Sequence, residues 1–233
     1  MAEWWDNIVQ IFIVCFIKDD RWKYIVNGLG ITLVVTFFAV ILGITIGFIV
    51  AIIRSTNDKT GKLKIPNAIC KFYLTVIRGT PVVVQLLIAY FVIFTSRNTS
   101  AVFVAVLAFG INSGAYVAEI FRGGINAIDA GQFEAGRSLG FNYSRTMWHI
   151  VMPQAFKNVV PPLANEFIVL LKETAICGYI GLQDLTKGAD IIRGVSYQAF
   201  MPLIAAALIY LIMVMFLSMG VTRLERRLRR NER

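Results

Sequence analysis

Hydrophobic residues in this chain gather in long stretches, and the polar residues gather between them. Three of the stretches contain no charged residue: 24–53, 98–118 and 194–222. A helix that crosses a lipid bilayer needs about 20 mainly apolar residues, because it rises only about 1.5 Å per residue. Each of these stretches is therefore predicted to form one membrane-spanning helix.

Two further apolar stretches, 66–94 and 159–180, are interrupted by charge. A charged group inside a membrane span costs about 2.5–3.5 kcal/mol on insertion scales, so such groups usually face a cavity or a partner rather than lipid. With these two, we predict an all-α membrane protein with five transmembrane helices, forming a single domain over residues 1–233. The interrupting residues are Lys71 and Arg78 in the first stretch, and Glu166, Lys172 and Glu173 in the second.

The N-terminal segment follows a different pattern. Its apolar run, 7–17, is too short to cross a bilayer and has neither a basic leader nor a small-residue cleavage site, which argues against a signal peptide. Trp4, Trp5 and Trp22 flank the run. Aromatic flanks are typical of a helix that lies at the membrane surface. We therefore expect residues 1–23 to form an interfacial segment.

Composition excludes several classes of protein. The chain has 233 residues, of which 57% are hydrophobic and 16% charged, whereas soluble domains carry about 25% charge. The net charge is +9, and the basic residues lie mainly between the apolar stretches. Basic residues in such positions determine the orientation of a membrane protein, so they are not taken as a sign of nucleic-acid binding. A single histidine, His149, and three distant cysteines predict no metal site and no Ser-His-Asp triad. A phosphate-binding GxxxxGK[ST] loop is also missing, so no catalysis is expected in this chain.

The distribution of lysine and arginine predicts the orientation. With five spans, one side of the membrane receives the first loop, the central loop 126–157 with Arg122 just before it, and the arginine-rich tail 223–233, which together hold fourteen basic residues. The other side receives six. Because cytoplasmic loops are enriched in Lys and Arg, the C-terminus and the central loop are predicted to be cytoplasmic.

Residues 126–157 also contain residues that typically begin and end short helices, in positions that predict two of them. Asp129 is placed to cap a helix over 130–139, and Asn142 to cap a second one. Between them, Gly140 occupies the position where a helix end favours a left-handed backbone. Pro153 lacks a backbone donor and is expected to end or kink the second helix.

The first of these helices has features of a docking surface. Glu134, Arg137 and Ser138 share one face, because residues three and four apart are neighbours on a helix. The segment is placed in water, yet it contains three apolar residues, Phe133, Leu139 and Phe141. Such a mixed apolar and charged surface suits a protein partner. From these residues alone, a loop helix that packs on its own bundle is an equal alternative.

The loop matches a known pattern. It reads Glu-Ala-Gly, three residues, Gly, nine residues, Ile, one residue, Met-Pro, which resembles the EAA loop of bacterial ABC-importer permeases, the surface that docks on the ATPase subunit. Gly136 and Met152 depart from the usual Ala and Leu of that family. The resemblance assigns the coupling role to Glu134, Ala135, Gly136, Arg137, Ser138, Gly140, Ile150 and Pro153.

The resemblance extends from about Asn27 to the C-terminus. Arg78-Gly79-Thr80-Pro81 with Gln85-Leu86 is similar to the second-span motif of the polar amino acid permeases, whose closest subgroup here is the histidine/glutamate/glutamine/arginine type. The segments 114–125 and 165–174 are similar to the third and fourth spans of the same family.

This resemblance implies the transmembrane domain of a type I ABC importer in the bacterial cell membrane. It implies a dimer of permeases, formed with a second copy or a paralogue. It also implies two ATPase subunits that hold ATP and Mg²⁺ and an extracytoplasmic solute-binding protein that delivers an amino acid. No cofactor is expected in this chain, and besides these proteins its surroundings are membrane lipid.

The interrupted spans supply candidates for the substrate path. A zwitterionic amino acid needs a carboxylate for its ammonium group and a cation for its own carboxylate, and Glu166, beside Asn165, is the strongest candidate for the first role. Arg78 and Gln85 are seven apart, so they are predicted to share one helix face. Arg78 either lines the cavity through which the substrate passes or forms an ion pair that holds the helices of the bundle together. Glu166 slightly favours a polar or basic amino acid as substrate.

Two other functions fit an apolar chain of this kind. An ion-gradient-driven secondary transporter would need inverted repeats or coupling carboxylates, and no repeat is evident. A membrane anchor without a translocation path would have no use for the polar residues at Arg78 and Glu166. The importer permease is therefore the preferred hypothesis.

Overall fold

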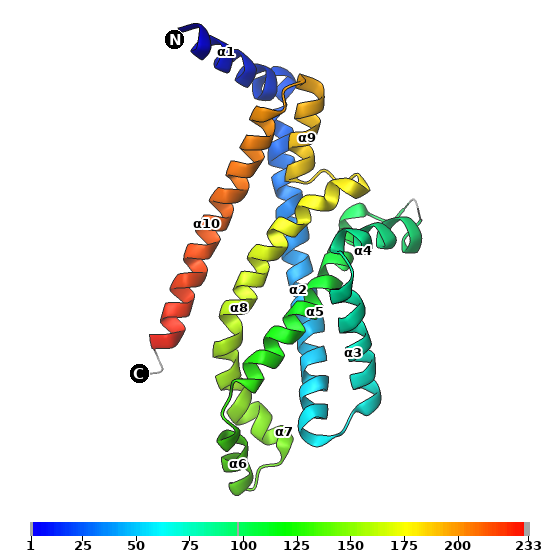
Figure 1. Cartoon of the computed structure of the whole chain (residues 1–233), viewed down its shortest axis with the longest axis vertical. Coiled ribbons are helices and arrows are strands. Elements are labelled where there is room, and N and C mark those ends of the chain that lie inside the picture. Colours follow the sequence, from blue (N-terminus) through cyan, green and yellow to red (C-terminus); the bar gives the residue numbers. More distant parts are fainter. Residues whose placement is uncertain (1, 97, 231–233) are drawn as a thin grey trace.

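The computed structural model describes residues 2–96 and 98–230, and the regular structure in this part is helical (Figure 1). Arg97 and the last three residues of the arginine-rich tail lie outside the described part. Short π-helical turns, η1 (Ile13–Ile17), η3 (Ala89–Ile93) and η4 (Met147–Val151), and 3-10 turns, η2 (Lys18–Asp20) and η5 (Thr174–Ile180), adjoin several of the helices. The helices are α1 (Ala2–Phe12), α2 (Trp22–Thr60), α3 (Lys64–Gly79), α4 (Val82–Ile88), α5 (Ala101–Asn126), α6 (Ala130–Ser138), α7 (Tyr143–Thr146), α8 (Met152–Glu173), α9 (Leu185–Ser196) and α10 (Phe200–Arg230).

The three uncharged stretches form the three helices that are long and apolar enough to cross a membrane, namely α2, α5 and α10. Their environments differ. Of the 18 consecutive residues that form the most apolar part of α5, 61% are buried within the chain. In the corresponding part of α10 only 11% are buried. The centre of the molecule is therefore α5, and α10 lies at its edge with most of its surface free to meet lipid or other subunits (Figure 1).

The interrupted stretches form helices of a different kind. The first is broken between α3 and the segment Val82–Ile93, which are bent by 106° and form either one broken span or a re-entrant loop. The second forms α8 and then a 3-10 segment, Thr174–Ile180. By length and composition the described helices supply three spans, or four if the bent pair counts as one. The number of five crossings stays a prediction.

The contact between α2 and α5 is built on small residues. A Cβ atom added to Gly47 would lie 2.5 Å from Val117 Cγ1, and one added to Gly110 would lie 2.6 Å from Leu42 Cδ2. Glycines in both helices therefore let the two backbones approach closely, as is common between membrane helices. The main apolar core surrounds this contact and includes the fully buried Phe109.

The extracytoplasmic end of α2, by the predicted orientation, is joined to α9 in the same way. Gly28 faces the backbone of Asp184, and a Cβ there would lie 2.5 Å from its carbonyl oxygen. Gly188 of α9 faces the backbone of Tyr24 in return. The Asp184 carboxylate caps α9 by accepting from the backbone N–H groups of Thr186 and Lys187 at 3.0 and 3.2 Å. These contacts fix α9 against the first span.

The N-terminal segment is helical and turns away from α2. Asp19 and Asp20 adopt left-handed backbone angles, with φ of 55° and 56°, and α1 points obliquely outward beyond them (Figure 1). Trp4 and Trp5 are 61% and 60% exposed. An interfacial position for residues 1–23 remains a prediction that this geometry supports.

Candidate coupling loop and polar path

The first short helix of the central loop forms as its capping residues predict. Asp129 Oδ1 accepts a hydrogen bond from the backbone N–H of Gly131 at 2.6 Å, and α6 runs from Ala130 to Ser138. Gly140 has a φ of 79°, which confirms the predicted left-handed residue. The backbone N–H of Phe141 closes the helix end on the Gly136 carbonyl at 3.0 Å. The elbow after α6 is therefore well defined.

The second helix also begins as predicted, but it does not end at the proline. Asn142 Oδ1 accepts from the backbone N–H of Arg145 at 2.9 Å and caps α7. A π-helical turn, Met147–Val151, then leads directly into α8, and Pro153 lies in the first turn of that helix. Pro153 therefore does not end the helix, because a proline is tolerated in a first turn, where its missing N–H is not needed. The alternative of a kink stays a prediction.

One side of the loop packs against the C-terminal end of α2. The Phe133 ring stacks on Tyr143 with centroids 6.2 Å apart, and Lys59 Nζ lies 5.1 Å from the Phe133 centroid. Burial raises the pKa of the Tyr143 hydroxyl, so the group stays protonated and donates to the Ser55 carbonyl at 3.4 Å. The alternative of a loop packed on its own bundle is thus correct for this side.

The other side of α6 is open to solvent. Leu139 is 71% exposed. A cavity of about 260 Å³ separates part of α6 from the end of α2, and its lining includes Lys59 and Thr60 as well as Glu134 and Arg137. Ser138 donates to the Glu134 carbonyl at 3.0 Å. Of the eight residues assigned to coupling, Gly136 is buried and Ile150 is partly buried; the exposed ones are Glu134, Ala135, Arg137, Ser138, Gly140 and Pro153.

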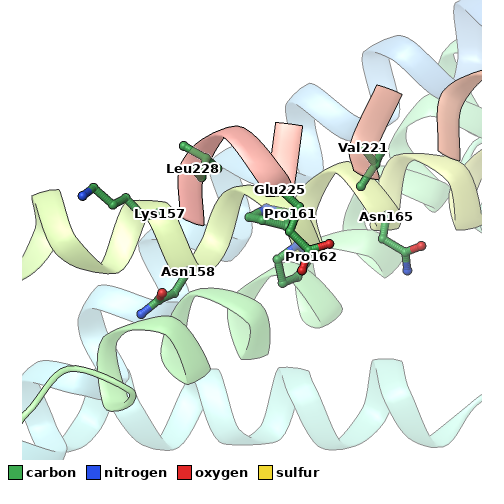
Figure 2. Close-up of a pocket in the computed structure, with 8 residues that line it drawn as sticks. All are labelled: Lys157, Asn158, Pro161, Pro162, Asn165, Val221, Glu225 and Leu228. Atoms are coloured by element: carbon green, nitrogen blue, oxygen red, sulfur yellow. The ribbon is translucent and has the colours of Figure 1, made fainter. Parts of the chain in front are cut away.

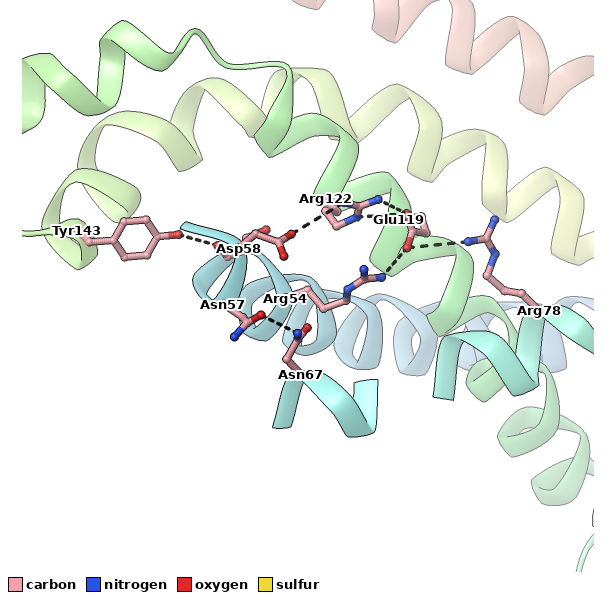
Figure 3. A network of polar contacts seen from close by, with 9 residues as sticks. Arg54, Asn57, Asp58, Asn67, Arg78, Glu119, Arg122 and Tyr143 are labelled. Carbon is pink, nitrogen blue, oxygen red and sulfur yellow. Dashed lines mark hydrogen bonds and ion pairs between the residues drawn. The ribbon is translucent and has the colours of Figure 1, made fainter. Parts of the chain in front are cut away.

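A cluster of ion pairs centred on Glu119 joins three helices (Figure 3). One carboxylate oxygen lies 3.0 Å from Arg54 Nη1 of α2, and the other lies 3.1 Å from Arg122 Nη2 of α5 itself. Arg78, at the end of α3, is more distant, with 3.9 Å between Nη1 and Oε1, and its side chain is 47% exposed. Arg122 also reaches Asp58 at 4.0 Å.

The predicted alignment of Arg78 with Gln85 is wrong. The bend at Thr80-Pro81 separates them, so Arg78 turns towards α5, where its guanidinium lies 5.7 Å from the Tyr116 ring. Gln85 Nε2 instead donates to the Ile77 carbonyl at 2.8 Å and to Thr80 Oγ1 at 2.8 Å, and its Oε1 accepts from Asn112 at 2.9 Å. Gln85 thus satisfies polar groups that the helix break leaves free.

Glu166 and Asn165 are neighbours in the chain but face different helices. Glu166 Oε1 accepts a hydrogen bond from Ser113 of α5 at 2.8 Å. Asn165 is exposed and lines a groove of about 800 Å³ between α8 and α10, in which Glu225 lies opposite Pro161 and Pro162 (Figure 2). The structure therefore does not bring the two predicted residues to one site.

Sequence reasoning missed the roles of Arg54, Arg122 and Ser113. The two arginines were counted with the charges of cytoplasmic loops, yet both lie within helices and hold Glu119. The available signal was the spacing of Asn112, Tyr116 and Glu119, which are four and three residues apart. This spacing places three polar side chains on one helix face, where they can bond to neighbouring helices. No pattern marks Ser113 as the partner of a glutamate 53 residues away.

A family model for binding-protein-dependent transport system inner membrane components matches residues 43–230, which is most of the chain. The chain belongs to this family. The matched range contains the coupling loop and the helix break. The relatives described next confirm the predicted resemblance to amino acid ABC permeases.

Two curated permeases show the extent of the similarity. The chain is 39% identical over 211 residues to the arginine transport system permease protein ArtQ of Bacillus subtilis, covering 90% of this chain and 94% of that protein. It is 34% identical over 209 residues to the glutamine transport system permease protein GlnP of Escherichia coli, covering 88% and 93%.

Solved structures agree with the fold of the permease. One, titled as the crystal structure of an amino acid ABC transporter with histidines, has a chain with a TM-score of 0.79 and 44% identity, covering 88% of this chain and 94% of that one. A chain from inward-facing structures of the MetNI methionine ABC transporter reaches a TM-score of 0.77 at 18% identity, which shows the fold alone.

The glycine in the Glu-Ala-Gly motif of this permease has a steric cause. A Cβ atom at Gly136 would lie 2.5 Å from Thr146 Cγ2 and 2.6 Å from its Oγ1. Thr146 is buried, and its hydroxyl has no hydrogen-bond partner in the described part of the chain. The alanine that is usual in this family therefore cannot fit while Thr146 faces it.

We expect Gly136→Ala to destabilise the coupling loop by about 1–3 kcal/mol, the usual range for overpacking. Thr146→Ala should restore much of this loss in the double variant, because it removes both atoms that a Cβ would meet. Thermal unfolding of the purified permease measures each variant, and Gly123→Ala, with no atom within 4 Å of the added Cβ, is the control. If Gly136→Ala lowers the stability equally in the parent protein and in the Thr146→Ala variant, the steric account is contradicted.

Proposed function

We propose that this chain is the permease subunit of an ATP-driven importer that carries a polar or basic amino acid into the cytoplasm. The single observation that carries the proposal is the two-sided coupling loop. One side is anchored to α2 through Phe133 and Tyr143, and the other presents Glu134 and Arg137 to solvent. A loop held in this way transmits movement from a docked partner to the spans.

The proposed partner at the loop is an ABC ATPase subunit, which would supply all ATP and Mg²⁺ chemistry. Two permeases, either identical or paralogous, would enclose the path, and a solute-binding protein would deliver substrate from outside. The C-terminus and loop 126–157 would be cytoplasmic. The ATPase would drive the spans only if its contact with α6 differs between the inward-open and outward-open states.

Within the path, Glu166 would attract the ammonium group or a basic side chain of the substrate. Its carboxylate has one neutral partner in Ser113, so the negative charge has no cationic partner in this contact. Arg78 would attract the substrate carboxylate, since its guanidinium is half exposed. Asn165 faces the groove beside α10 instead and is not part of this proposed site. Gln85 would contribute by fixing the bend that presents Arg78 rather than by touching substrate.

Uptake by the assembled complex tests this function. Purified permease, ATPase and binding protein are placed in liposomes, and basic, neutral polar and acidic amino acids are offered with or without enclosed ATP. The proposal expects ATP-dependent uptake of a polar or basic amino acid. Uptake that depends on an imposed ion gradient and not on ATP would establish the secondary-transporter alternative instead.

In the same vesicles, Glu166→Ala is expected to raise the substrate concentration needed for uptake about tenfold or more, because charge-assisted contacts contribute about 1.5–3 kcal/mol. Ser113→Ala is the matched control, because it removes the hydrogen bond at Glu166 but leaves the carboxylate. If Glu166→Ala changes neither affinity nor rate, the residue is structural.

A further inference from the structure

Helix α3 carries a basic stripe that the coupling loop and Glu166 do not use. Lys64, Lys71 and Arg78 are seven residues apart, and all three are exposed. Seven residues make almost two helical turns, so these side chains follow one face at steps of about 10 Å. Thr75 is also exposed and lies one turn above Lys71 on this face.

The upper part of the stripe borders a cavity of about 450 Å³. Arg54, Lys71 and Arg78 line it together with a single carboxylate, Glu119. Three cations therefore face one anion in the same cavity. This imbalance raises the local concentration of anions.

The single carboxylate is already engaged. Glu119 lies 3.0 Å from Arg54 and 3.1 Å from Arg122, whereas Arg78 is 3.9 Å away and half exposed. Arg54 Nε is buried without a hydrogen-bond partner in the described part of the chain. Within the described part, no ion pair involves Lys71, so Lys71 and Arg78 keep binding capacity for a further anion.

The length of the stripe argues against lipid headgroups as that anion. Lys64 and Arg78 are fourteen residues apart on one helix, which is about 21 Å. A headgroup layer is only about 5–8 Å thick on each side of the hydrocarbon core. One leaflet cannot supply phosphates at both ends, so the upper part of the stripe requires water or a solute.

We infer that Lys71 and Arg78 form an anion site that receives the carboxylate of the amino acid as it moves from the helix bend towards the cytoplasm. Lys71 is a positioning residue in this scheme, two turns nearer the cytoplasm than Arg78. The inference rests on the proposed amino acid transport. It adds a defined inward route along α3 for the anionic end of the substrate.

A cysteine at Thr75 reports on this site. The Thr75→Cys transporter, assembled with its ATPase in liposomes, is treated with an anionic (sulfonatoethyl) or a cationic (trimethylammonioethyl) methanethiosulfonate. Parent protein measures the background, because Cys15, Cys70 and Cys177 are all buried. The anionic reagent is expected to react faster, and L-arginine or L-glutamine should slow it whereas their α-amides should not.

Removing the charge of Lys71 gives the decisive comparison. Lys71→Met in the Thr75→Cys background should lower the ratio of anionic to cationic rates about tenfold, because one charge about 6 Å away changes each rate about threefold in opposite directions. Lys71→Arg should preserve the ratio. Lys62→Met removes an equal charge from the exposed loop before α3 and should leave the ratio close to the parent value.

Three results would overturn the inference. Equal protection by the amides would show that the carboxylate is not recognised. Failure of both reagents to reach the cysteine would place this face against lipid, and protection that follows the anionic lipid content would assign the site to headgroups. Uptake by parent vesicles is measured in parallel, so that loss of amino acid transport itself, which contradicts the proposed function, is distinguished from an unprotected cysteine.

Discussion

Glu134→Lys is expected to leave the permease in the membrane while abolishing its ATP-driven uptake. Glu134 is exposed on α6, one turn from Arg137, and both residues border the cavity between α6 and the end of α2. Reversing its charge places two cations side by side on the proposed ATPase contact. Truncating one partner of an interfacial charge pair costs about 2–5 kcal/mol. Charge reversal should cost at least as much, which corresponds to binding of the ATPase subunit that is weaker by about thirtyfold or more.

Separate measurements of membrane content, uptake and ATP hydrolysis check this result. Asp6→Lys makes the same charge change on exposed α1, at the opposite end of the molecule from the loop (Figure 1), and should transport normally. Glu134→Gln should fall between the parent and the reversed variant. Full uptake by Glu134→Lys would remove this face from the coupling contact.

Glu119→Gln is expected to cause the largest loss of stability. It leaves Arg54, whose side chain is only 15% exposed, without the carboxylate 3.0 Å away, and weakens the hold on Arg78 and Arg122. Removing one partner of a buried ion pair costs about 3–5 kcal/mol, and partial exposure places this site near the lower end. A fall in melting temperature of roughly 6–12 °C should follow.

Two comparisons test the origin of that loss. Asp20→Asn removes a carboxylate from an exposed pair with Lys23 and should leave the melting temperature close to the parent value, because solvent screens such a pair. The double variant Glu119→Gln with Arg54→Gln should be more stable than the sum of the single losses predicts, because the unpaired buried charge is gone. Additive losses would mean that the two residues act independently.

Short-range chemistry made the coupling loop predictable. Asp129 and Asn142 cap helices through donors two or three residues away, and Gly140 adopts its left-handed angle at the adjacent helix end. Each of these interactions lies within a few residues of sequence, so the residue type alone indicates the structure. The long uncharged stretches were predictable for the same reason, since length and apolarity decide whether a helix can span a bilayer.

Contacts between distant segments could not be predicted in this way. Counting charges treats Arg54 like a solvated loop residue, although it pairs with a carboxylate 65 residues further along. The assumption of a straight helix placed Arg78 and Gln85 together, whereas the chain bends by 106° between their helices. Gly136 is a departure from its family whose cause, the neighbouring Thr146, appears only when α6 and α7 are folded together.

The hydrogen bonds of Gln85 have a mechanical consequence. Breaks in membrane helices often serve as joints, but here the Gln85 amide ties the end of α3 to α4, and Asn112 ties that amide to α5. The bend is thus braced on both sides, and we expect it to move together with α5 rather than to act as a joint.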